Sequence, residues 1–137
     1  MAVTITRLST QQVLADRAEL AQSLPARLIG LLSRSTLRDG EALILPHCSA
    51  IHTCFMRFPI DVVFVSTRPR GILGTSAPFH GAGGIVVKTV QHLKPFRLTW
   101  AVGADTAIEL PAGTLSRIPA PIGELLIWNP SASTRLS

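Results

Sequence analysis

Residues 50–65 read Ala-Ile-His-Thr-Cys-Phe-Met-Arg-Phe-Pro-Ile-Asp-Val-Val-Phe-Val, and this stretch decides the fold class. β-branched and aromatic side chains, which favour strands, dominate both halves of it. Pro59 separates the halves, because proline cannot donate to a sheet ladder and marks a strand boundary. We therefore expect two strands, over 50–56 and 60–65.

Similar short apolar runs recur along the chain, and glycine or proline flanks nearly every one. They predict further strands over 42–45, 85–90, 97–102, 107–110 and 125–128, with an opening strand around Val3 and Ile5. Pro25 and a stripe of leucines predict one helix over 24–34. Propensity does not decide the secondary structure of 13–21, since its alanine, leucine and glutamate content suits a helix and its pattern also suits a strand.

These elements predict one mainly β domain over 1–137, either a β-sandwich or a closed β-barrel with one packed α-helix. The glycine-rich and proline-rich stretch 66–84 is expected to be a long loop. The polar end, 131–137, is expected to fray. Most aromatic side chains are expected in the core, and Phe79 with His80 in the long loop is the predicted contact patch.

Composition limits the classes of function. The chain has 47% hydrophobic and 15% charged residues, which predicts a compact interior. Its net charge of +5 comes from basic residues scattered singly, apart from Arg68 and Arg70, and this argues against nucleic-acid binding. The sequence contains neither a signal peptide nor an apolar run long enough to span a bilayer, so we expect no membrane partner, a cytoplasmic location and reduced cysteines.

Four segments resemble the bacterial domain of unknown function 192 family. They are Arg27-Leu-Ile-Gly-Leu-Leu-Ser-Arg34, His52-Thr-Cys-Phe-Met-Arg-Phe-Pro-Ile-Asp61, Leu93-Lys-Pro-Phe-Arg97 and Glu109-Leu-Pro-Ala-Gly-Thr114. Together they extend the resemblance over about 13–128. The resemblance implies a β-rich fold and a strand at 13–21, and it carries no settled activity.

Soft and borderline metal ligands gather at Cys48, His52, Cys54 and Met56. On one continuous strand their even spacing would place them on one face, so His52, Cys54 and Met56 are weak candidates for a copper or zinc site. The alternative is that the cysteines and Met56 are apolar core residues. We assign no metal and no cofactor.

Polar residues in the same stretch suggest a second kind of site. His52 has the pKa range of a general base, and Arg57, Asp61 and Glu109 are its candidate partners. The alternative is a buried polar network that fixes strand register. The sequence contains no nucleophile elbow and no nucleotide-binding motif.

The resulting hypothesis is a non-catalytic binding or interaction module for an unknown protein or small-molecule ligand. The alternative is a small metal-dependent or acid/base enzyme centred on His52 with Asp61 or Glu109. Whether the chain is an enzyme stays open, and the balance of these signals favours a binding role.

Overall fold

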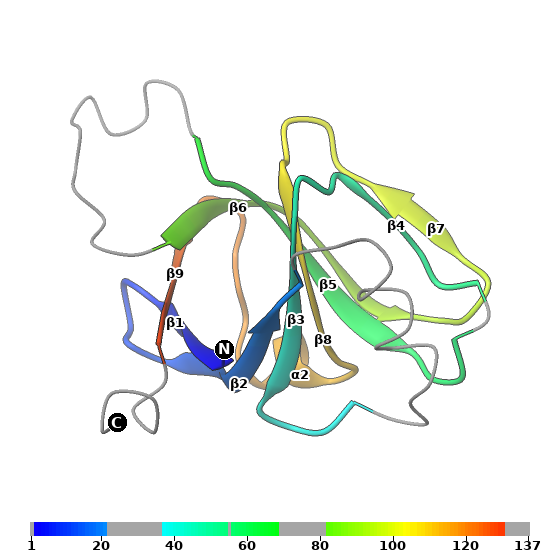
Figure 1. The fold of residues 1–137 in the computed structure, drawn as a ribbon, viewed down its shortest axis with the longest axis horizontal. Helices are drawn as coiled ribbons and strands as arrows, with labels where there is room; N and C mark the ends of the chain where they lie inside the picture. The colour runs from blue at the N-terminus through cyan, green and yellow to red at the C-terminus, as the bar shows by residue number, and fades with distance from the viewer. Residues whose placement is uncertain (1, 22–36, 55, 69–81, 131–137) are drawn as a thin grey trace.

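A computed structural model describes residues 2–21, 37–54, 56–68 and 82–130 (Figure 1). The described strands are β1 (Ala2–Arg7), β2 (Val13–Leu20), β3 (Glu41–Pro46), β4 (Ala50–His52), β5 (Ile60–Ser66), β6 (Ala82–Leu93), β7 (Leu98–Trp100), β8 (Thr106–Pro111) and β9 (Leu125–Pro130). One short helix, α2 (Thr114–Arg117), follows β8. Seven strands close into a barrel in the order β1-β2-β3-β8-β5-β6-β9, and β4 forms a separate two-stranded sheet with β7. The prediction of a mainly β domain is confirmed, in its barrel form.

β5 is buried on both of its sides, because its apolar run has no solvent-facing side. Six of its seven residues are buried, and it pairs antiparallel with both β6 and β8. Val63 and Val65 point into the barrel, where they join side chains from all seven strands. Val62 and Phe64 point outward into a second apolar cluster.

The second cluster lies between the barrel wall and the small sheet made by β4 and β7, which we call the ribbon (Figure 1). Ile51 of β4 and Ala101, just after β7, contribute to this cluster from the ribbon side. The ribbon therefore has one face against the barrel and one face away from it.

β2 and β3 pair in parallel, in contrast to the antiparallel pairs around the rest of the barrel. A parallel pair requires a crossover connection, and residues 21–40 make it. The helix predicted over 24–34 falls in this connection and lies outside the described residues. The strand at 13–21 is confirmed as β2, so the family resemblance was a better guide there than helix propensity.

The strand predicted over 50–56 is wrong beyond His52. The chain turns after Thr53, whose carbonyl accepts the Met56 N–H at 3.2 Å. The loop predicted over 66–84 is also too long at both ends, because Ser66 belongs to β5 and β6 begins at Ala82. A Cβ on Gly84 would lie 2.9 Å from the Ser66 carbonyl oxygen, so the glycines of β6 permit close strand approach rather than a turn.

Candidate functional site

Asp61 lies on β5 and is fully buried. One carboxylate oxygen accepts the His92 N–H at 2.8 Å, and the other accepts the Leu115 N–H at 2.9 Å. Leu115 is in the first turn of α2, where backbone N–H groups lack helical partners. The Asp61 carboxylate therefore joins the end of β6 to the start of α2, and both of its oxygens are engaged.

Thr53 makes a second buried connection. Its hydroxyl donates to the Lys94 carbonyl at 2.6 Å and accepts the Arg97 N–H at 2.9 Å, and the side chain is 0% exposed. Its own carbonyl accepts the Phe96 N–H at 3.0 Å. The His52–Asp61 segment and the Leu93–Arg97 segment, both singled out in the sequence, therefore meet at this one hydroxyl.

His52 and Arg57 do not join Asp61. His52 is exposed at the end of β4, and Arg57 is exposed after the turn at Thr53. The hypothesis of a polar site required neighbouring strands to bring these side chains together. The structure instead places His52 on the ribbon and Asp61 inside the barrel wall.

Glu109 is buried on β8, next to β5, but it does not share a face with Asp61. The antiparallel register places Asp61 opposite Leu110 and Val62 opposite Glu109. Paired residues of antiparallel strands point to the same side of the sheet, and successive residues alternate. Asp61 therefore points into the barrel with Leu110, and Glu109 points outward with Val62.

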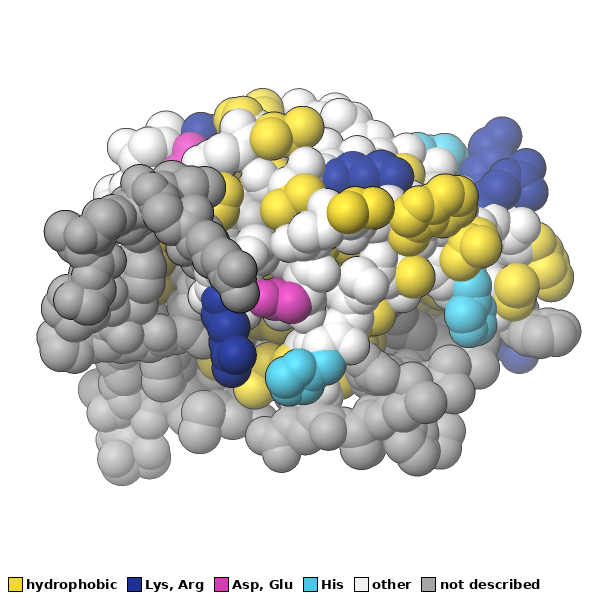
Figure 2. All heavy atoms as spheres, turned by 90° about the horizontal axis from the view of Figure 1, so that it is seen from above, with side chains coloured by type: hydrophobic (Ala, Val, Ile, Leu, Met, Phe, Trp, Pro, Cys, Tyr) yellow, Lys and Arg dark blue, Asp and Glu magenta, His cyan; other side chains and the backbone are white. Residues whose placement is uncertain are grey.

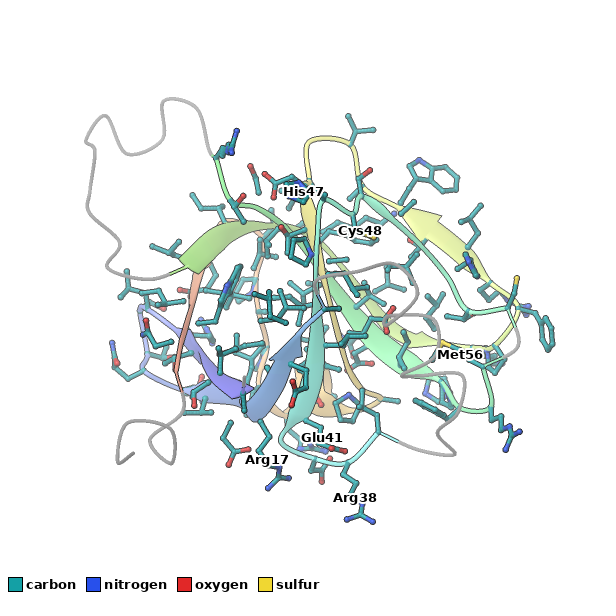
Figure 3. All side chains as sticks on the ribbon, in the orientation of Figure 1. Arg17, Arg38, Glu41, His47, Cys48 and Met56 are labelled. Atoms are coloured by element: carbon teal, nitrogen blue, oxygen red, sulfur yellow. The ribbon has the colours of Figure 1, made fainter. Side chains whose placement is uncertain are left out.

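The proposed metal ligands are also dispersed. His52 is exposed, Met56 is buried in the outer cluster, and the two cysteines are half-buried free thiols. The Cys48 thiol donates to the Ala50 carbonyl at 3.0 Å, and Figure 3 shows Cys48 and Met56 in different parts of the molecule. The one-face arrangement of these four residues is wrong. Within the described ranges, no three His, Cys, Asp or Glu side chains form a group suited to a metal.

The outer face of the ribbon carries large exposed apolar side chains. Leu98 is 62% exposed and Trp100 is 59% exposed, and they pair across the ribbon with His52 and Ala50. Phe96 at one end is 63% exposed, and Val102 at the other is 90% exposed. Figure 2 shows hydrophobic side chains gathered over the right-hand part of the molecule, beside basic side chains and a histidine.

Most aromatic side chains were expected in the core, and Trp100 departs from that expectation. Thr99 and Ala101 are the buried residues of this segment, so the small side chains face the barrel and the large ones face outward. The alternation of Phe96, Leu98, Trp100 and Val102 with polar or small residues was the available signal. In an ordinary half-buried strand the large apolar side chains face the core, whereas here they face outward.

Lys88 of β6 fixes the position of Trp100. Its ammonium group donates to the Trp100 carbonyl at 2.7 Å and lies 5.9 Å from the centre of the indole ring. This distance allows a cation–π contact. The exposed ring is therefore held from the barrel side by a basic residue.

A separate polar cluster lies where β1 meets the start of β9, away from the ribbon. The Glu124 carboxylate accepts hydrogen bonds from the Arg7 guanidinium at 2.8 Å and from the Ser9 hydroxyl at 2.6 Å. Burial alone would raise the pKa of Glu124, but the Ser9 and Arg7 contacts outweigh it and lower this pKa below its ordinary value. Because these bonds join the two chain ends, we interpret this cluster as structural.

The fold and these contacts define a class: a closed β-barrel with an attached two-stranded ribbon, in which the polar signature residues hold strands and turns together. Comparison with known families gives the assignment. Residues 4–72 match the model of the DUF192 family, described as uncharacterised ACR proteins. The chain belongs to this family, as the four sequence segments indicated.

Two solved structures share the fold. A protein of unknown function from Novosphingobium aromaticivorans DSM 12444 superposes with a TM-score of 0.68 at 23% identity, covering 93% of this chain and 84% of that one. A candidate transcription regulator from Sinorhizobium meliloti 1021 superposes with a TM-score of 0.67 at 16% identity, covering 92% and 91%. No curated protein sequence matches the chain. None of the helices in the described ranges has the length and hydropathy needed to cross a membrane.

Proposed function

We propose that this protein is a non-catalytic interaction module that binds its partner through the outer face of the ribbon. The observation that carries the proposal is the exposure of Leu98 and Trp100, at 62% and 59%, on a paired strand. Together with Phe96 and Val102 they expose an apolar area of roughly several hundred Å², the scale at which patches on soluble proteins are often functional. Tryptophan is also among the residues that contribute most to binding energy at protein interfaces.

The position of the polar residues supports a binding role over acid/base chemistry. A general base must lie within hydrogen-bond reach of its partners and its substrate. His52 stands on the ribbon, Asp61 binds two backbone amides, and Glu109 faces the other side of the barrel wall. The candidate enzyme centred on His52 therefore lacks an assembled set of groups in the described part of the chain.

The test uses a tagged chain and a ribbon variant, Leu98→Ser with Trp100→Ser, in parallel pull-downs from the native host. Val13→Ser is the matched control, because Val13 is a 44% exposed apolar residue on β2, outside the ribbon. A stoichiometric partner should remain bound to the native chain and to the Val13→Ser chain, and should be lost from the ribbon variant. Equal retention by all three chains would refute binding through the ribbon.

Elemental analysis tests the competing hypothesis of a metal-dependent enzyme. Purified native protein should contain no stoichiometric transition metal. A metal present in equimolar amount and lost in His52→Ala would overturn the interaction-module proposal in favour of a metal site at His52.

A further inference from the structure

We infer that the partner of the ribbon is a protein segment that presents acidic side chains around apolar ones. This inference rests on the proposed function and adds the chemical class of the partner. It follows from where the fold places the charges of the chain and from how rigidly it holds the exposed side chains.

The charges of the chain are unevenly distributed. None of its eight acidic residues lies within 42–60 or 85–104, the two segments that build the ribbon and its supports. Those segments carry Arg57, Lys88, Lys94 and Arg97, of which Arg57, Lys94 and Arg97 are exposed. None of these four forms an ion pair with a described residue. The segments that carry the apolar face therefore contain basic residues and no acidic ones.

Two basic residues elsewhere in the described barrel pair with acidic residues. Arg117 pairs with Asp39 at 3.1 Å and Arg7 pairs with Glu124 at 2.8 Å. Arg17, Arg38 and Glu41 gather at the lower end of β3, away from the ribbon (Figure 3). Among the described residues, the segments 42–60 and 85–104 carry four basic and no acidic residues, whereas the remaining described residues carry five basic and eight acidic ones. Complementary potentials across an interface speed association and select the partner, so an acidic surface fits this face.

Hydrogen bonds hold the turn that leads into the ribbon. Phe96 has a φ of 62°, in the left-handed region that an aromatic residue rarely adopts. The buried Thr53 holds this turn through its hydroxyl contacts with Lys94 and Arg97. A strained, locked turn that presents an aromatic ring suits a partner of defined shape.

This rigidity favours a protein over the other anionic partners. A fluid bilayer imposes no fixed shape on the side chains it accepts, so it would not require the held turn. Single-stranded nucleic acid binds by stacking bases on aromatic faces, but Lys88 already occupies one side of the Trp100 ring. The other exposed residues of the ribbon are Leu98 and Val102, whose aliphatic side chains offer no ring on which a base could stack.

The experiment selects random 12-residue peptides displayed on phage against the full-length native chain. The Leu98→Ser, Trp100→Ser chain serves as the counter-selection. Selected peptides are then titrated against the native chain and against Arg97→Glu, with tryptophan emission as the readout. Trp128 is 6% exposed and gives a constant background, so the change in emission reports Trp100. Thermal unfolding of every variant confirms that it is folded.

The expected result is enrichment of peptides that combine aspartate or glutamate with aromatic or aliphatic residues. Their affinity should fall about tenfold in Arg97→Glu and by a similar factor between about 0.05 and 0.5 M salt. Ribbon-dependent enrichment of neutral or basic peptides would overturn the acidic class and leave the proposed function intact. Enrichment that ignores the ribbon substitutions, or none at all, would overturn both.

Two further probes test the excluded partners directly. Vesicles of phosphatidylcholine with about one-third phosphatidylserine, and a 20-residue oligothymidylate, are each titrated with the same emission readout. Binding of either probe that is tighter than that of the best peptide, and weakened in Leu98→Ser, which keeps the Trp100 reporter, would overturn the protein partner.

Discussion

Replacing Asp61 is the most informative perturbation of this fold. In Asp61→Ala the His92 and Leu115 N–H groups, now bonded at 2.8 and 2.9 Å, would lose their acceptors inside the protein. A stranded buried donor costs about 1–3 kcal/mol, and hydrogen bonds to a charged acceptor lie at the upper end. Two such donors give about 2–6 kcal/mol, partly offset because the variant no longer buries a carboxylate. We expect a net loss of about 2–4 kcal/mol, out of the 5–15 kcal/mol typical of a folded domain.

The assay is urea unfolding followed by tryptophan emission, with the free energy of unfolding extrapolated to water. Asp61→Asn separates the hydrogen bonds from side-chain volume. It should lose nearly as much stability as Asp61→Ala, because an amide NH₂ would face one of the two donors. Asp39→Ala is the control, since Asp39 makes an exposed ion pair and should change stability by less than about 1 kcal/mol. Equal unfolding midpoints for Asp61→Ala and the native chain would refute the role assigned to this carboxylate.

Three further predictions concern single side chains. Thr53→Val should lower the free energy of unfolding by about 1–3 kcal/mol, whereas Thr53→Ser should keep most of the stability; urea unfolding of both variants measures the difference. Because the pKa of Glu124 is lowered in the folded state, its contribution is present above the ordinary value of 4.5 and is lost as the pH falls through the folded-state pKa. Glu124→Gln should therefore be about 1 kcal/mol less stable than the native chain at pH 7, and the melting temperatures of the two chains should converge as the pH falls through the folded-state pKa of Glu124. Gly84→Ala should lower the melting temperature by several degrees, because its Cβ would lie 2.9 Å from the Ser66 carbonyl; an unchanged melting temperature would contradict this close approach.

The barrel strands were predictable because each carries a local pattern. The β-branched run at Ile60–Ser66 and the proline and glycine positions between strands act within a few residues. The burial of Asp61 was also predictable, since a single carboxylate within Ile-Asp-Val-Val-Phe must lie among apolar neighbours. Its partners were not, because they are backbone N–H groups 31 and 54 residues away that carry no side-chain signal.

The predicted candidate site was wrong because of one local feature. The turn after Thr53 separates His52 from Asp61, and its cause is a hydroxyl contact with residues more than 40 positions away. Strand periodicity cannot register such a contact, so the even spacing of Cys48, His52, Cys54 and Met56 was taken as a shared face. The exposed row of the ribbon was missed for a related reason. Pairing of β7 with β4 alone, and not with a barrel strand, turns its large side chains outward.

The seam of the barrel has a consequence for synthesis. β9 lies between β1 and β6, so the last strand of the described barrel in chain order pairs with the first. Until then a nascent chain holds β1 and β6 with open edges that invite pairing with other chains. Barrel closure must therefore wait until β9 has been made, and a chain that stalls before β9 would be a ready target for chaperones and proteases.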